Sequence, residues 1–300
     1  MKLFVTSFRA LGGPAEIQLA APNETFAQQW MRAAIEEIDR IEKKYSRYRG
    51  DSLVSTVNRL AGREGVPLDP ETRALIELAH SMHATSDGRF DLTSGVWRRA
   101  WDFRLGARIP QLAELDCIRP LVGWDKVEWR GHQLRLGLEG MELDFGGIGK
   151  EHAVDSACSV LIESGVQHAL VNLAGDLRAL GCKPDGSSWR VGIRDPHARS
   201  TVMAEIELAN EALATSGNYE RHVTRQGQRL GHILDSRTGW PVTYWSSITV
   251  KAATALLAGS ISTLAFVMET DGQRLLDSSG VDYLAVPTPV DGLSGRACRT

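Results

Sequence analysis

The stretch LDFGGIGKEHAVDSACSVLIESGVQHALVNLAGDLRALG, from Leu143 to Gly181, decides how this chain folds. An acidic residue and a glycine-rich turn lead directly into Lys150. From Lys150 to Glu163 the apolar residues recur at helical spacing, and Gly165 follows where a helix commonly ends. His168 to Leu173 is then an apolar run of strand length. The stretch predicts a glycine turn, a helix packed on one face and a buried strand, which is an arrangement of mixed α and β structure.

The glycine turn before Lys150 is a place where a phosphate could approach the backbone. A helix start has free N–H groups and the positive end of the helix dipole. Two known phosphate loops do not match, because Asp144 and Glu151 stand where a P-loop needs Gly and Ser or Thr, and His152 stands where the dinucleotide fingerprint has Gly. A glycine turn that only lets the helix pack closely on a sheet remains the alternative.

Composition limits the class of protein. The 300 residues are 43% hydrophobic, enough for one large domain or two intimately packed lobes over residues 1–300. A net charge of −3 without a basic block argues against nucleic acid and anionic membrane surfaces as partners. The four cysteines are widely spaced and form no Cys-x-x-Cys pair, so neither a zinc site nor a disulfide framework is predicted.

Two segments indicate where in the cell we expect the protein. The first 13 residues lack the continuous apolar core of a signal peptide. The apolar run from Ala252 to Met268 contains several small polar residues and is shorter than the roughly 20 residues of a membrane span. We therefore expect a buried helix there, no membrane span, and a cytoplasmic protein.

The other elements follow from periodicity, caps and turn residues. A helix capped by Asn23 and running to Tyr45 has the clearest amphipathic pattern, and a second helix starts at Asp69-Pro70 and stops at Asp87-Gly88. A polar turn is expected at Ala214–Tyr219. The predicted strands are Lys2–Ser7, Ala15–Leu19, Trp189–Arg194, Ala204–Leu208, His232–Asp235 and Ser247–Val250.

Taken together, five separated motifs resemble the ApbE-type flavin transferases, which are FAD:protein FMN transferases. They lie in the family's order and span nearly the whole chain. The motifs are Ser46-Arg47-Tyr48 with Asn58; Gly88 to Thr93; Asp144 to Lys150 with Ala174-Gly175-Asp176; Ser216 to Tyr219 with His232 to Asp235; and Ala258 to Thr263.

The resemblance implies a mixed α/β fold, one ApbE-like domain of mixed sheets with flanking helices, and FAD in a cleft. It also implies attack by a Thr hydroxyl of a target protein on the FAD pyrophosphate, so that FMN becomes esterified to that Thr and AMP leaves. The residues that it assigns to the FAD site are Leu11, Tyr48, Arg89, Phe90, Asp91, Asp144, Lys150 and Ile233.

The chemistry of several of these residues agrees with that assignment. Lys150 at a helix start can offset pyrophosphate charge, Tyr48 offers a ring face, and Asp144 can accept hydrogen bonds. By residue type His232 is the best-placed general base, with Lys150 as the second catalytic residue. The alternatives are a satisfied structural histidine and, for Tyr48, a half-buried packing residue at a helix end.

The chain departs from the family pattern at the metal site. The family has an Ala-Asp-x-x-x-Thr helix start that binds Mg²⁺ together with a carbonyl of the glycine turn. Here Gly147 and Thr263 remain, but Gly259 stands at the Asp position, and Ser260 would point about 100° away. Glu151 and Ala174 also stand where the family usually has Gly.

Loss of the carboxylate at position 259 predicts weakened Mg²⁺ binding, because Mg²⁺ relies on carboxylates and phosphates. Two functions follow. The first is an active transferase whose metal is held mainly by FAD phosphates, Thr263 and carbonyls. The second is a flavoprotein that has lost FMN transfer and stores, senses or delivers FAD.

Overall fold

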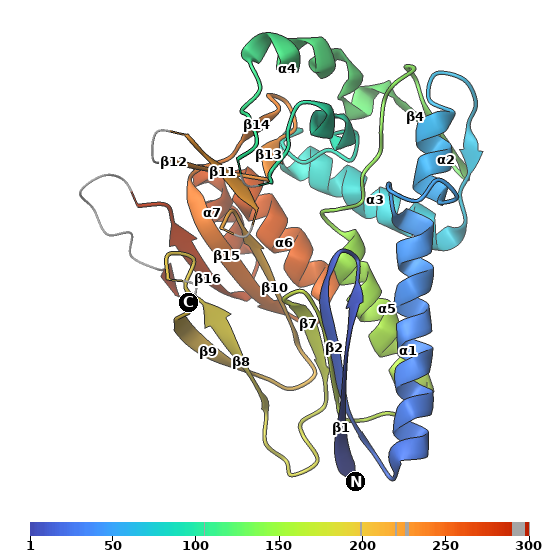
Figure 1. Ribbon diagram of the computed structural model, residues 1–300, viewed down its shortest axis with the longest axis vertical. Helices are drawn as coiled ribbons and strands as arrows, with labels where there is room; N and C mark the ends of the chain where they lie inside the picture. The colour runs from blue at the N-terminus through green and yellow to red at the C-terminus, as the bar shows by residue number, and fades with distance from the viewer. Residues whose placement is uncertain (105, 199, 220, 226–227, 290–297, 300) are drawn as a thin grey trace.

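The computed structural model describes residues 1–104, 106–198, 200–219, 221–225, 228–289 and 298–299. Its centre is an eight-stranded sheet in which every neighbouring pair is antiparallel. Three helices pack beside this sheet, so the mixed α/β fold is confirmed (Figure 1). In order across the sheet, the strands are β1 (Lys2–Ala10), β2 (Gly13–Ala21), β6 (Ala169–Leu173), β7 (Asp176–Leu180), β10 (Ala212–Gly217), β15 (Trp245–Ala252), β16 (Asp282–Pro287) and β17 (Cys298–Arg299).

The three helices are α1 (Glu24–Tyr45), α5 (Gly149–Glu163) and α6 (Ala255–Val267). Helix α5 lies between α1 and α6 and contacts strands β6 and β7, while α6 covers β10 and β15 (Figure 1). The predicted cap of α1 is present, because the Asn23 side chain accepts a hydrogen bond from the Phe26 N–H at 3.1 Å. The three helices therefore bury one face of the sheet and bring the N-terminal end of α5 beside α6.

Smaller elements surround this centre. The smaller helices are α2 (Leu53–Arg59), α3 (Pro70–Thr85), α4 (Leu112–Ile118) and α7 (Thr270–Ser278). Short 3₁₀ turns lie at Gly95–Arg99, Arg119–Leu121 and Trp124–Lys126. The small sheets contain β3 (Val66–Pro67), β4 (Val127–Arg130), β5 (Gln133–Leu136), β8 (Trp189–Arg194), β9 (Val202–Leu208), β11 (His222–Arg225), β12 (Gln228–Gly231), β13 (Leu234–Asp235) and β14 (Trp240–Pro241). In the part of the chain that the structure describes, no helix combines the length and apolarity of a membrane span.

One predicted element is wrong. The polar turn expected at Ala214–Tyr219 is largely strand β10, which lies between β7 and β15. Its polar side chains find partners inside the protein: the Thr215 and Thr249 hydroxyls lie 2.9 Å apart, and so do the hydroxyls of Ser216 and Ser262. A polar run can form a central strand because these hydrogen bonds satisfy its buried oxygens.

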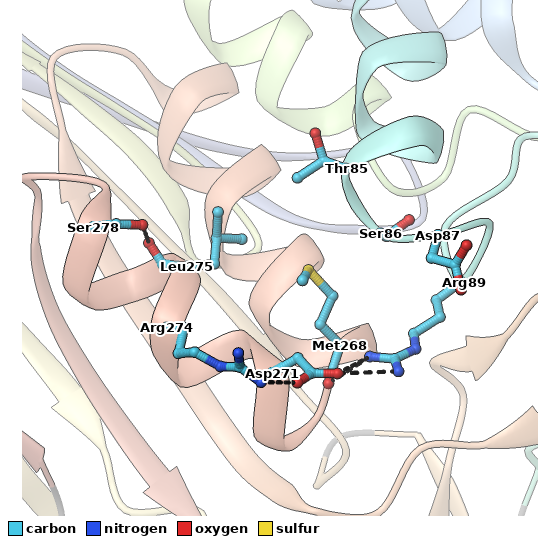
Figure 2. Close-up of a pocket in the computed structure, with 9 residues that line it drawn as sticks. All are labelled: Thr85, Ser86, Asp87, Arg89, Met268, Asp271, Arg274, Leu275 and Ser278. Carbon is cyan, nitrogen blue, oxygen red and sulfur yellow. Dashed lines mark hydrogen bonds and ion pairs between the residues drawn. The ribbon is translucent and has the colours of Figure 1, made fainter.

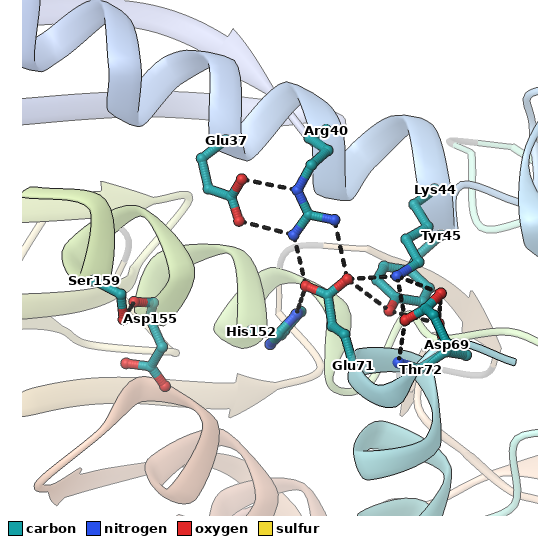
Figure 3. Close-up of polar contacts among 10 residues, drawn as sticks. All are labelled: Glu37, Arg40, Lys44, Tyr45, Asp69, Glu71, Thr72, His152, Asp155 and Ser159. Carbon is teal, nitrogen blue, oxygen red and sulfur yellow. Dashed lines mark hydrogen bonds and ion pairs between the residues drawn. The ribbon is translucent and has the colours of Figure 1, made fainter. Parts of the chain in front are cut away.

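A cluster of charged side chains joins α1, α3 and α5 (Figure 3). Glu71 lies at its centre and accepts hydrogen bonds from Arg40 at 2.6 Å and Lys44 at 2.5 Å. A ring nitrogen of His152 lies 3.0 Å from the same carboxylate. Burial alone would raise the pKa of Glu71, but the hydrogen bonds from Arg40, Lys44 and His152 outweigh it and hold that pKa far below its usual range.

Replacing Glu71 by Gln should therefore lower the free energy of unfolding at pH 7, by about 1–2 kcal/mol for a partly exposed cluster. A carboxylate with a lowered folded pKa stabilises fully above its unfolded pKa of about 4.3, and this contribution is lost as the pH falls through the folded pKa. The difference between the two proteins should thus shrink below about pH 4. Urea unfolding across pH measures it, with Glu36→Gln at an exposed position of α1 as the control. If the difference in unfolding free energy between wild type and Glu71→Gln stayed constant down to pH 3, the lowered pKa of Glu71 would be contradicted.

Candidate active site

The glycine turn before α5 is held by its own backbone and by close packing. The N–H groups of Ile148 and Gly149 donate to the Phe145 carbonyl at 3.0 and 2.7 Å. A Cβ atom on Gly147 would lie 3.0 Å from Cε2 of Phe90, so a side chain at this position would press on that buried ring. The turn is therefore fixed in place by the loop that carries Phe90.

Asp144, at the start of this turn, connects it to the end of α1. Its backbone N–H donates to the Leu92 carbonyl at 2.8 Å, and its carboxylate forms a 2.7 Å ion pair with Arg47. Arg47 also donates to the Tyr48 hydroxyl at 3.1 Å and lies over the Tyr48 ring. Because Tyr48 is 79% exposed, the alternative of a half-buried packing residue is wrong. Its ring is free to stack against a ligand.

Lys150, in the first turn of α5, forms an ion pair with Asp176 at the start of β7. The other oxygen of Asp176 accepts a hydrogen bond from the Thr215 N–H at 3.4 Å. Burial alone would lower the pKa of Lys150, but the charges of Asp176 and Glu151 outweigh it and raise that pKa. Lys150 is therefore a fixed positive charge at the helix start.

A second cation lies in the same region, and the sequence analysis did not identify it. The guanidinium of Arg221 lies 4.0 Å from the position that a Cβ on Gly12 would take, and its charge acts on both Lys150 and His232. Nothing in the local pattern around Arg221 distinguishes it from other surface arginines. Only the fold brings the β1–β2 turn, the start of α5 and this arginine together.

His232 lies at the edge of this positive region and is exposed to solvent. Its backbone N–H donates to the Arg221 carbonyl at 3.1 Å. Crowding by protein atoms lowers the pKa of His232 below its usual range, and the charges of Arg221 and Lys150 act in the same direction. The imidazole is therefore neutral near pH 7 and able to accept a proton. The next residue, Ile233, packs against the core beneath it.

Leu11 occupies the turn between β1 and β2 in the left-handed region, with φ at 50°. Its N–H donates to the Glu42 carboxylate at 2.8 Å, which ties the turn to α1. The turn also approaches the loop after β6, because a Cβ on Gly13 would lie 2.7 Å from that of Ala174. The Leu11 side chain packs against the hydrophobic core, next to Gly12 in the turn that Arg221 approaches.

The side chains of Arg89 and Asp91 are both held by partners within the protein. Arg89 donates to the Met268 carbonyl at 2.8 Å and pairs with Asp271 of α7, and it lines a groove of about 410 Å³ (Figure 2). Asp91 is 4% exposed and accepts hydrogen bonds from the Thr93 N–H at 2.7 Å and the Trp124 N–H at 2.9 Å. Both side chains therefore hold the loop that presents Phe90, and their direct contact with a ligand stays a prediction.

The residues predicted for the metal come together around α6. The methyl carbon of Thr263 lies 3.8 Å from the position that a Cβ on Gly147 would take, and the Thr263 and Ser216 hydroxyls lie 3.2 Å apart. Gly259 lies one helical turn before Thr263 and faces Glu151. Among the described residues no group of three or more His, Cys, Asp or Glu side chains could hold a metal. A cation here would need hydroxyl, carbonyl or ligand oxygens as well.

Glu151 is the other residue that sequence reasoning did not place in the site. It is 6% exposed, and its Oε2 atom has no hydrogen-bond partner. Burial raises the pKa of Glu151 above its usual range, against the opposing charge of Lys150. Its deviation from the family's Gly was visible in the sequence, but its contact with α6 was not.

Several known proteins resemble this chain in sequence and in fold. The profile of the ApbE family matches residues 11–285. An FAD:protein FMN transferase of Vibrio cholerae is 28% identical, over 87% of this chain and 81% of the relative. One of Treponema pallidum is 30% identical, over 85% of this chain and 77% of the relative.

Solved structures show the same fold. The ApbE protein of Thermotoga maritima superposes with a TM-score of 0.88 at 30% identity, covering 100% of this chain and 97% of that one. The flavinyl transferase ApbE of Pseudomonas stutzeri superposes with a TM-score of 0.86 at 28% identity, covering 99% and 94%. The profile match spans the glycine turn, Lys150, His232 and the α6 motif, and this chain belongs to the ApbE family.

Proposed function

We propose that this protein transfers FMN from FAD to a Thr hydroxyl of a target protein and releases AMP. The observation that carries the proposal is the glycine turn at the start of α5, with Lys150 fixed by Asp176 and the neutral His232 beside the same positive region. Helix N–H groups and a fixed cation suit a pyrophosphate. The relatives of Vibrio cholerae and Treponema pallidum are named for this transfer.

The residues divide between holding FAD and moving a proton. Lys150 and Arg221 would offset the two pyrophosphate charges, and Tyr48 would stack on a flavin or adenine ring. The oxygen of the acceptor hydroxyl attacks the phosphorus of the FMN half, and the bond from that phosphorus to the AMP oxygen breaks. The hydroxyl proton passes to a ring nitrogen of His232. The other residues predicted to line FAD are Leu11, Arg89, Phe90, Asp91, Asp144 and Ile233.

A Mg²⁺ ion fits the oxygen atoms present in this site. Gly147 and Thr263 lie close together, and the buried Glu151 carboxylate lies against Gly259, one helical turn before Thr263. The Thr263 hydroxyl, the Gly147 carbonyl and the Glu151 carboxylate would be the protein's ligands. When bound, Mg²⁺ would offset pyrophosphate charge and orient the phosphates. Beside these ligands, Lys150 supplies a fixed positive charge, and the neutral His232 would accept the proton of the attacking hydroxyl.

Incubation with FAD, Mg²⁺ and a Thr-containing acceptor peptide tests the proposal. We expect the peptide to gain the mass of FMN and AMP to appear in equal amount. A matched peptide with Val in place of its Thr should gain no mass, because it lacks the attacking hydroxyl. Tight FAD binding without any peptide adduct would instead support an FAD storage, sensing or delivery protein. A cytoplasmic location stays a prediction from the sequence.

Tyr48 offers a test of the FAD-binding half of the site. Tyr48→Ala should weaken FAD binding about 10-fold through loss of stacking, while Tyr48→Phe should retain most of the affinity. Unfolding should be little affected in both, since the ring is 79% exposed. Fluorescence titration of FAD measures the affinity. Equal affinity of the Ala and Phe variants would show that no ring stacks on this tyrosine.

A further inference from the structure

Glu151 and Gly259 share one space between α5 and α6. A Cβ atom on Gly259 would lie 2.4 Å from Cγ and 2.9 Å from Oε1 of Glu151, far closer than van der Waals contact. The Glu151 carboxylate therefore occupies the position from which a side chain at 259 would start. Relative to the family pattern, Gly and an acidic residue have exchanged places between the two helices.

Contacts between the two helices fix this arrangement. Asp155, one turn after Glu151 on α5, accepts hydrogen bonds from the N–H groups of Ala255 and Leu256 at 3.0 and 2.8 Å. These are the first residues of α6, so the helix start is anchored to α5. Gly259 lies one turn further along α6, and Glu151 therefore meets it across a fixed interface.

One oxygen of the Glu151 carboxylate, Oε2, lacks a hydrogen-bond partner among the described residues. The nearby Lys150 is paired with Asp176, so the three side chains together carry one excess negative charge when all are ionised. Oε2 of Glu151 is buried and makes no hydrogen bond among the described residues. An unpaired buried carboxylate is costly unless a cation compensates it, and a helix that only packs has no need of one.

This carboxylate lies against Gly259, one of the residues predicted for the metal site. Gly259 and Thr263 are four residues apart on α6 and lie on the same face. The methyl carbon of Thr263 lies 3.8 Å from the position that a Cβ on Gly147 would take, and Glu151 lies against Gly259. The residues that carry the carboxylate, the hydroxyl and the turn carbonyl therefore lie near one another at the start of α5.

We propose that Glu151 supplies the carboxylate ligand of the divalent cation that acts with the FAD pyrophosphate, from the opposite helix to the one the family pattern uses. The inference rests on the proposed FAD chemistry of this site. It replaces the prediction of a metal site without a carboxylate. It also means that Gly259→Asp alone would not restore a ligand, because the new side chain would collide with Glu151.

Mn²⁺ titrated into the full-length, FAD-saturated protein without acceptor tests the proposal, with free Mn²⁺ followed by electron paramagnetic resonance. FAD alone in buffer is the blank. Glu151→Gln keeps the shape and removes the charge, and should weaken Mn²⁺ binding about 10- to 100-fold. Without metal its FAD affinity should stay within about threefold, and its melting temperature should not fall, since an uncompensated charge is gone.

Two further variants sharpen the result. Glu163→Gln, at an exposed position near the end of α5, should bind Mn²⁺ like the wild type. The double variant Glu151→Gly with Gly259→Asp moves the carboxylate to α6, and should recover Mn²⁺ binding to within about threefold of the wild type. Unchanged Mn²⁺ affinity in Glu151→Gln overturns the proposal. If the double variant does not fold, the result of Glu151→Gln alone decides.

The proposed function and this inference can fail separately. A wild type that neither binds FAD nor modifies the acceptor peptide contradicts the proposed function. A wild type that modifies the peptide with Mg²⁺, beside a Glu151→Gln variant of unchanged Mn²⁺ affinity, contradicts the ligand assignment alone.

Discussion

Lys150→Ala should weaken FAD binding about 10- to 100-fold and leave riboflavin affinity within about threefold, because only FAD carries the charged pyrophosphate. The reason is the position of the ammonium group in the first turn of α5, fixed by its ion pair with Asp176. FMN transfer to the acceptor peptide should fall by a further factor of about 100, since the same cation would offset charge that develops on the leaving phosphate.

The comparison of the two ligands is an internal control for folding of the Lys150→Ala variant. A damaged site loses both ligands, whereas loss of a phosphate contact affects FAD alone. Lys150→Arg should keep most of the FAD affinity, and Lys43→Ala at an exposed position of α1 should change neither. Fluorescence titrations with FAD and riboflavin measure all four proteins. Equal losses for both ligands in Lys150→Ala would show that this lysine does not contact phosphate.

Asp91→Ala should destabilise the protein by about 3–5 kcal/mol, the largest change in stability that we expect from any single substitution described above. The carboxylate accepts hydrogen bonds from the backbone N–H and hydroxyl of Thr93 and from the Trp124 N–H, all in buried surroundings. A ring nitrogen of His83 lies 3.3 Å away. Alanine leaves the Thr93 and Trp124 donors without this acceptor in buried surroundings.

Urea unfolding measures this loss. Asp87→Asn is the control, because Asp87 precedes the same loop but is exposed and pairs with Arg237 at the surface, and because Asn tolerates its left-handed backbone with φ at 52°. It should cost less than about 1 kcal/mol. A loss of that small size for Asp91→Ala would mean that the loop holds its shape without the carboxylate. A large loss in FAD affinity at unchanged stability would instead make Asp91 a direct ligand contact.

The parts of the fold with a local signal could be predicted. The cap at Asn23 and the spacing of α1 determine that helix from within its own sequence, and the glycine turn before Lys150 identifies the start of α5 in the same way. Strand β10 could not be predicted, because its Ser and Thr side chains look like a turn until their partners on β15 and α6 are known.

The residues of the candidate site also fall into those with a local sequence signal and those without one. Tyr48, Lys150 and His232 each belong to a short motif, so the resemblance could locate them. The contribution of Arg221 depends on its approach to the β1–β2 turn, and that of Glu151 on its contact with Gly259. Both are contacts between residues far apart in the sequence, and the residue types alone do not encode them. The burial of the Asp91 side chain could not be predicted either, because it depends on the contact with Trp124.

The shared space between Glu151 and Gly259 has room for one side chain, and this makes the evolution of the two positions interdependent. A lineage that changes one position at a time passes either through a protein with both side chains, which is overcrowded, or through one with neither, which lacks the charge. Members of the family should therefore carry an acidic residue at one of the two positions and a small residue at the other. Position 259 considered alone would classify such a chain as an inactive enzyme. Positions 151 and 259 considered together identify a carboxylate that has moved to the other helix.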